Sequence, residues 1–207
     1  GIIAAITVPV VMANHRKTET TAKLKKFYSN LSNAVKLTEI EYGQPVYEFD
    51  FAGGMHTTET YNVLSSILSK LSAEYLGTEY AQNRFKDGES YIVYCENVFW
   101  NLDSYMLPDG TLLGSESSHD EYLLVDINGE KGPNVCGRDI FGFNIGIGNI
   151  CSHSKNKSLC FPQKDKNIQT TREELINSCA DSQSSVGCTK LIADDGWEIK
   201  DDYPIRL

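Results

Sequence analysis

Positive charge is scarce in this sequence of 207 residues, in which 19 Lys and Arg residues stand against 28 Asp and Glu, for a net charge of -9. Binding to nucleic-acid phosphates needs clustered Lys and Arg, so the overall charge argues against a nucleic-acid partner. A solvated helix face explains the one basic cluster better than a surface for nucleic acid or lipid headgroups. That cluster consists of Arg16, Lys17, Lys23, Lys25 and Lys26.

The motifs of common enzyme classes are also missing. The four histidines, His15, His56, His119 and His153, are far apart, and none belongs to an HExxH motif or accompanies a GxSxG serine. The Gly146-Ile147-Gly148 segment lacks the third glycine and the following helix of a dinucleotide-binding loop. We therefore expect a protein that is not an enzyme and that needs no cofactor.

No apolar run reaches the length of about 20 residues that crossing a bilayer takes. Residues 1–12 are nevertheless free of charge. We expect them to be the end of a longer apolar segment that lies in a membrane or in the core of a filament; a buried helix or a signal remnant are the alternatives. The large apolar residues of this segment are Ile2, Ile3, Ile6, Val8, Val10 and Val11.

An amphipathic pattern follows directly. Apolar residues recur every three or four positions up to Tyr42, which is the spacing of one helix face, and Gly43-Gln44-Pro45 ends the pattern. We therefore predict one helix over residues 1–42, apolar all round over 1–12 and amphipathic over 13–42. Its apolar stripe, which needs a globular domain to cover it, contains Leu24, Phe27, Leu31 and Val35.

Residues 43–207 combine a helical pattern with short strand-like runs, which is typical of a globular head. A second helical pattern runs from Tyr61 to Leu76, with Gly77 as its expected C-terminal cap, and Pro108-Asp109-Gly110 is typical of a hairpin turn. We predict an α+β fold in which the long N-terminal helix packs on a small antiparallel β-sheet. The expected strands are Ser90–Cys95, Ser104–Leu107, Thr111–Gly114, Tyr122–Asp126 and Ile140–Ile145.

The last quarter of the chain is rich in cysteine and poor in apolar residues. We expect a short helix from Thr171 to Cys179 with Thr171 as its N-cap. The even number of cysteines and the absence of a CxxC pair favour disulfides in an oxidising compartment over six free thiols. Cys179 with Cys188 is the pair best supported by spacing, and the other candidates are Cys95, Cys136, Cys151 and Cys160.

A loop rich in Asp, Asn and Gly follows the expected strand that ends at Asp126. Asp126, Asn128, Glu130 and Asp139 offer the oxygen ligands that calcium prefers, but their spacing does not match an EF-hand. Asp, Asn and Gly are also the ordinary residues of turns. We therefore favour a turn held by side-chain hydrogen bonds, with Asp126, Asn128 and Asp139 as weak candidates for a calcium site.

Three segments of the sequence resemble a known family. Residues Gly1 to Pro9 are similar to the distal half of the N-terminal helix of type IV prepilins, and the stretch to Tyr42 resembles its continuation. Val125–Phe143 and Cys179–Pro204 resemble bacterial pilin-like proteins and the pseudopilins of type II secretion. The resemblance implies a head outside the inner membrane, a single membrane-spanning helix, and assembly with other pilin-like subunits into an extracellular or periplasmic filament.

A second class of function stays open, namely a membrane-tethered extracytoplasmic protein whose head binds a ligand or surface. Aromatic residues that lie close together in the sequence could line such a site, although aromatics near strands more often belong to a core. The residues concerned are Tyr91, Tyr94, Phe99, Trp100 and Tyr105.

Overall fold

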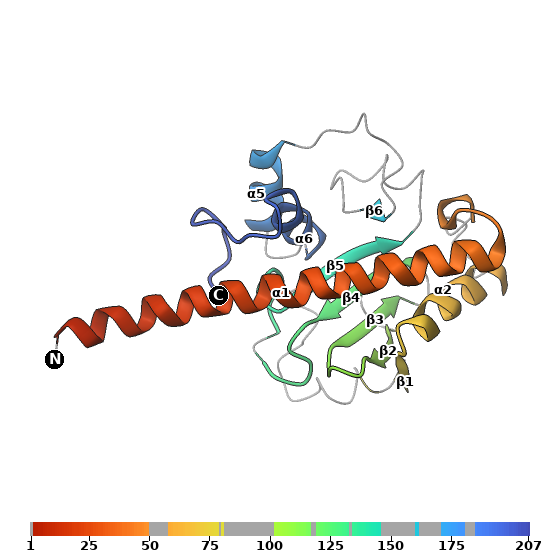
Figure 1. Ribbon diagram of the computed structural model, residues 1–207, viewed down its shortest axis with the longest axis horizontal. Coiled ribbons are helices and arrows are strands. Elements are labelled where there is room, and N and C mark those ends of the chain that lie inside the picture. The colour runs from red at the N-terminus through yellow and green to blue at the C-terminus, as the bar shows by residue number, and fades with distance from the viewer. Residues whose placement is uncertain are drawn as a thin grey trace.

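The computed structural model describes residues 2–49, 58–78, 80, 102–116, 119–132, 134–145, 160–161, 171–180 and 185–207. A long helix, α1 (Ile2–Tyr42), lies across a six-stranded sheet, and its N-terminal end extends beyond the rest of the molecule (Figure 1). The chain is thus an α+β protein with a long N-terminal helix on a mainly antiparallel sheet, which confirms the predicted fold class.

Helix α1 is a single element of 41 residues, as the continuous pattern predicted. At 1.5 Å per residue it is about 60 Å long. It ends where Gly43 adopts a left-handed conformation (φ +70°) and donates its N–H to the carbonyl oxygen of Glu39 at 2.9 Å. The chain then passes through a short 3-10 helix, η1 (Val46–Glu48), and Phe49 packs edge-on against Tyr42.

Helix α2 (Thr58–Lys70) runs beside the C-terminal part of α1 and is shorter than predicted (Figure 1). It ends in a Schellman motif, in which Ser72 is left-handed (φ 56°) and the N–H of Ala73 bonds to the carbonyl oxygen of Leu68 at 3.0 Å. The residues beyond, Glu74–Gly77, form strand β1. The predicted helix over 61–76 with Gly77 as its cap is therefore wrong in its last turn.

The sheet is a meander in which five strands are antiparallel and follow one another in chain order. The predicted Pro108-Asp109-Gly110 turn joins β2 to β3, with the Gly110 N–H bonded to the Leu107 oxygen at 2.9 Å. Strand β6 (Cys160–Phe161) adds a short parallel pair. The predicted strand at Ser90–Cys95 lies outside the described residues. The remaining strands are β2 (Leu102–Met106), β3 (Leu112–Glu116), β4 (His119–Asp126) and β5 (Ile140–Ile145).

The core lies between one face of α1 and the sheet. The rings of Phe27 on α1 and Phe143 on β5 meet edge to face, with their centroids 5.1 Å apart. Burying a side chain of this size stabilises the fold by about 1.5–3 kcal/mol. The stripe residues Leu24, Phe27, Leu31 and Val35 are all at least 96% buried.

Two short helices, α5 (Arg172–Ala180) and α6 (Ser185–Asp194), lie on the side of the sheet nearer the free end of α1 (Figure 1). Helix α5 begins with a capping box, since the Thr171 hydroxyl accepts the Glu174 N–H and the Glu174 carboxylate accepts the Thr171 N–H. The predicted disulfide between Cys179 and Cys188 is present and joins the two helices.

Candidate assembly surface

The N-terminal end of α1 extends beyond the head, and residues 2–12 are here named the projecting segment (Figure 1). Val11 and Met12 are 65% and 51% exposed, and from Val11 onward the first buried residue of the helix is Thr20. One uninterrupted helix therefore runs from the projecting segment into the core (Figure 1).

The predicted membrane or filament residues lie in this projecting segment. The structure describes the helical backbone of Ile2, Ile3, Ile6, Val8 and Val10, and it exposes the side chain of Val11. Among the described residues, no helix combines the length and the apolarity that crossing a membrane requires.

Two ion pairs and one aromatic contact join α1 to the head along its middle section. The Lys17 ammonium lies 2.9 Å from the carboxylate of Asp201 in the C-terminal tail, and the ring of Tyr28 packs on Trp197 with centroids 4.9 Å apart. Lys26 reaches Asp109 in the β2–β3 turn at 2.8 Å. Exposed ion pairs of this kind contribute at most about 1 kcal/mol each, so they orient the helix more than they stabilise it.

The loop after β4 is closed by its own carboxylates. The Asp126 carboxylate accepts the backbone N–H groups of Asn128 and Gly129, both at 3.1 Å, which is an Asx turn. The Asp139 carboxylate accepts the N–H of Asn134 at 2.9 Å and that of Val135. Burial raises the pKa of Asp139 above its ordinary value, while these backbone donors act against the shift.

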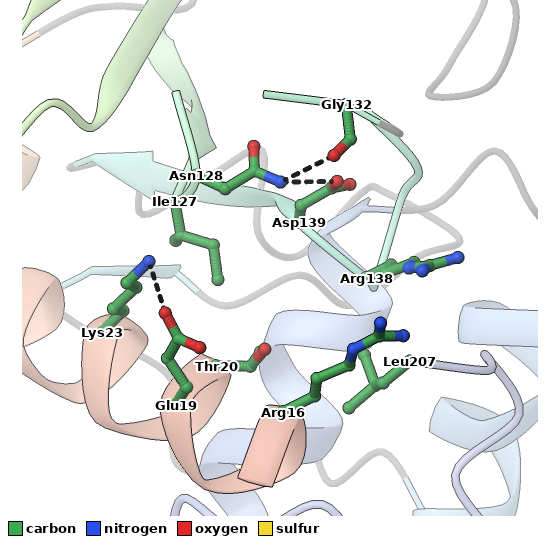
Figure 2. A pocket seen from close by; sticks show the side chains of 10 residues that line it. All are labelled: Arg16, Glu19, Thr20, Lys23, Ile127, Asn128, Gly132, Arg138, Asp139 and Leu207. Carbon is green, nitrogen blue, oxygen red and sulfur yellow. Dashed lines mark hydrogen bonds and ion pairs between the residues drawn. The ribbon is translucent and has the colours of Figure 1, made fainter. Parts of the chain in front are cut away.

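These contacts bear on the calcium candidates. Both carboxylates already face N–H donors, whose hydrogens point to the positions that a cation would need. The side-chain amide of Asn128 also donates to Asp139 at 3.0 Å, and its buried oxygen accepts no hydrogen bond from any described residue (Figure 2). Within the described ranges no group of three or more His, Cys, Asp or Glu side chains is placed to hold a metal ion.

A hollow of about 230 Å³ separates α1 from this loop (Figure 2). Glu19 and Lys23 pair with each other at 3.0 Å on one side of it, and Arg16 and Arg138 lie together on the other side, next to Leu207. Arg16 belongs to the basic cluster that is visible in the sequence. Arg138 joins it only because the loop before β5 folds back toward α1, which no local pattern in the sequence indicates.

The other candidate residues do not gather into one site. Tyr105 packs on the exposed Tyr75 with ring centroids 5.2 Å apart, and the other four aromatics of the predicted cluster lie outside the described residues. His15 is exposed on α1 and His119 begins β4, whereas His56 and His153 are not among the described residues.

The remaining cysteines are only partly described. Cys136 is buried and disulfide-bonded. Cys160 lies in β6, where only its backbone is described, and Cys95 and Cys151 lie outside the described residues.

Sequence comparison assigns the chain to a family without adding a function. No curated protein and no solved structure matches it. Residues 10–207, which are the whole chain except its first nine residues, match the family described as "Family of unknown function (DUF6613)". The chain therefore belongs to the DUF6613 family.

Proposed function

We propose that this chain is a structural subunit of a bacterial type IV pilus or pseudopilus-like filament, anchored in the inner membrane before it assembles. It acts through contacts between subunits and not through catalysis. One observation carries the proposal: a single helix whose apolar stripe from Leu24 to Val35 is buried by the head continues at its N-terminal end into a part where Val11 and Met12 are more than half exposed. The resemblance of residues 1–9 to a prepilin helix agrees with this division of the helix.

The projecting segment needs an apolar environment. Residues 1–12 contain no charged side chain, and Val11 and Met12 are more than half exposed. Exposed apolar surface of this kind marks a site of association with protein or lipid. Lipid would cover it before assembly, and the helices of neighbouring pilin-like subunits would cover it in the filament.

The head is expected to fold without that segment. The stripe from Leu24 to Val35 and the Lys17–Asp201 ion pair all lie beyond Asn14. A variant that begins at Asn14 should therefore keep the helical and sheet content of the head and sediment as a monomer. The 207-residue chain should self-associate in the absence of detergent.

Circular dichroism and sedimentation velocity on these two proteins test the proposal. Unfolding of the shortened protein would show that residues 1–13 belong to the core of the head. If both proteins were equally soluble monomers, the proposal would lose its physical basis, and a tethered binding protein would become the better account.

A further inference from the structure

A second hollow lies where α1 leaves the head, between the helix and the C-terminal tail. Its volume is about 780 Å³, and it shares Arg16, Arg138 and Leu207 with the hollow in Figure 2. Five basic residues line it, together with a single acidic one, Asp201. The five are Arg16, Lys17, Arg138, Lys200 and Arg206.

This concentration of positive charge is unusual for a chain with a net charge of -9. The one acid is already engaged, because Asp201 pairs with Lys17 at 2.9 Å. Arg16, Arg138 and Arg206 form no ion pair with any residue that the structure describes. By contrast, Arg172 at the start of α5 binds two carboxylates. The hollow thus holds three guanidinium groups that form no ion pair with a described carboxylate, although the charge of Arg138 also acts on the carboxylate of Asp139 beside it.

The apolar part of the lining says which anion fits. Met12 and Ala13 of α1 lie in the same hollow, one helical turn before Arg16 and Lys17. Four residues of helix advance about 6 Å, so the basic side chains lie that far from the end of the apolar segment. When that segment lies in hydrocarbon, Arg16 and its neighbours therefore reach the depth of the lipid headgroups.

We infer that this hollow binds the phosphate headgroups of anionic phospholipids and seats the base of the head on the membrane. The inference rests on the proposed function, because the apolar segment brings the hollow to the bilayer. It replaces the simpler interpretation of Arg16 and Lys17 as a solvated helix face. At physiological salt the Debye length is about 8 Å, so these local charges outweigh the acidic remainder of the chain.

Flotation of the 207-residue protein with vesicles tests the inference. One vesicle contains phosphatidylcholine alone, and the other also contains the anionic lipid phosphatidylglycerol, whose negative surface potential attracts basic residues. Each basic residue near an anionic surface adds measurably to binding, so we expect roughly tenfold tighter binding to the anionic vesicles at about 0.1 M salt. The preference should disappear at about 0.5 M salt.

The variant Arg16→Gln/Arg138→Gln should lose this preference and still float with both vesicles. The matched control is Lys25→Gln/Lys36→Gln, which removes the same charge from two exposed positions of α1 that do not line the hollow. The control should keep the preference, and circular dichroism should show that both variants are folded.

Three results would overturn the inference. If the protein floated equally with both vesicles, the headgroup site would be wrong and the proposed function would stand. If the two variants lost the same amount of binding, the hollow would have no special role. Flotation with neither vesicle would contradict both the headgroup site and the membrane-anchored subunit.

Discussion

The hydroxyl of Tyr203 donates a hydrogen bond to the carbonyl oxygen of Gly137 at 2.6 Å, and this bond joins the C-terminal tail to the loop before β5. The tail carries Arg206 and the loop carries Arg138, so the bond brings together two walls of the basic hollow. Burial raises the pKa of Tyr203 well above its ordinary value, which keeps the hydroxyl protonated and able to donate.

Replacing Tyr203 with Phe should lower the free energy of unfolding by about 1–3 kcal/mol, because the variant removes the donor to a backbone oxygen at a partly buried position. Tyr61→Phe is the matched control, since Tyr61 is 54% exposed, and its effect should stay within about 0.5 kcal/mol. Urea denaturation measures both. Equal stability of the two variants would show that the bond does not hold the tail.

Gly137 is expected to tolerate no side chain. Its φ is +74°, and a Cβ atom there would lie 2.5 Å from the Cys188 sulfur and 2.9 Å from the Tyr203 hydroxyl oxygen. Gly196 has a similar φ of +78° with no atom within 4 Å of such a Cβ. Gly196→Ala should therefore cost only the backbone strain of about 1–2 kcal/mol.

Gly137→Ala should cost a further 1–3 kcal/mol or so through the steric clash. Thermal denaturation of the two alanine variants separates the two contributions. A Gly137→Ala protein as stable as Gly196→Ala would contradict the close packing of the loop on the disulfide.

The acid stability of the C-terminal region should depend on Arg172. Hydrogen bonds from Arg172 hold the pKa values of Asp195 and Asp202 below their ordinary value of 3.8. The folded state therefore binds fewer protons than the unfolded state as these groups titrate. Their stabilisation is complete above the ordinary value and is lost as the pH falls through the lower folded pKa values.

We expect the free energy of unfolding to fall as the pH is lowered from about 4 to 2, with an uptake of up to about two protons on unfolding. Arg172→Gln should make this fall less steep, because it removes the hydrogen bonds that lower the two pKa values. Urea denaturation across that pH range measures it. The raised pKa of Asp139 acts in the opposite direction but is common to both proteins, so it cancels in the comparison. Lys25→Gln serves as the control, and a curve for Arg172→Gln that parallels the parent would refute the role of this network.

Local sequence patterns predicted the elements that local forces determine. The three-to-four spacing from Leu24 to Val35 specifies one helix face, and the structure buries that face. The strand-like run Ile140–Ile145 was predicted with the ends that the structure shows. The end of α2 was missed because Ser72 takes a left-handed conformation that usually belongs to glycine, and the short strand after it carries little pattern of its own.

No local sequence pattern predicts the basic hollow. Arg16, Arg138 and Arg206 are far apart in sequence, and they meet only because Tyr203 bonds the tail to the loop and Trp197 packs the tail on α1. Contacts of this range depend on the finished fold, so neither spacing nor propensity indicates them. The basic cluster seen in the sequence includes Arg16 and Lys17 of this hollow, and it does not indicate Arg138 or Arg206.

In the proposed filament the projecting segment of α1 is the surface through which subunits associate. Two exposed apolar residues of the same helix allow a matched test: Val11 is 65% exposed on the projecting part, and Leu37 is 53% exposed on the part that the head accompanies. Val11→Glu places a charge where the partner helix or lipid would lie, and burying that charge is costly.

Sedimentation velocity without detergent on Val11→Glu and Leu37→Glu, each compared with the parent chain, is the decisive measurement. We predict that Val11→Glu weakens self-association at least about tenfold while Leu37→Glu leaves it unchanged, because only the first charge falls in the buried contact. If Leu37→Glu weakened association as much as Val11→Glu, or if neither did, the projecting segment would not be the assembly surface.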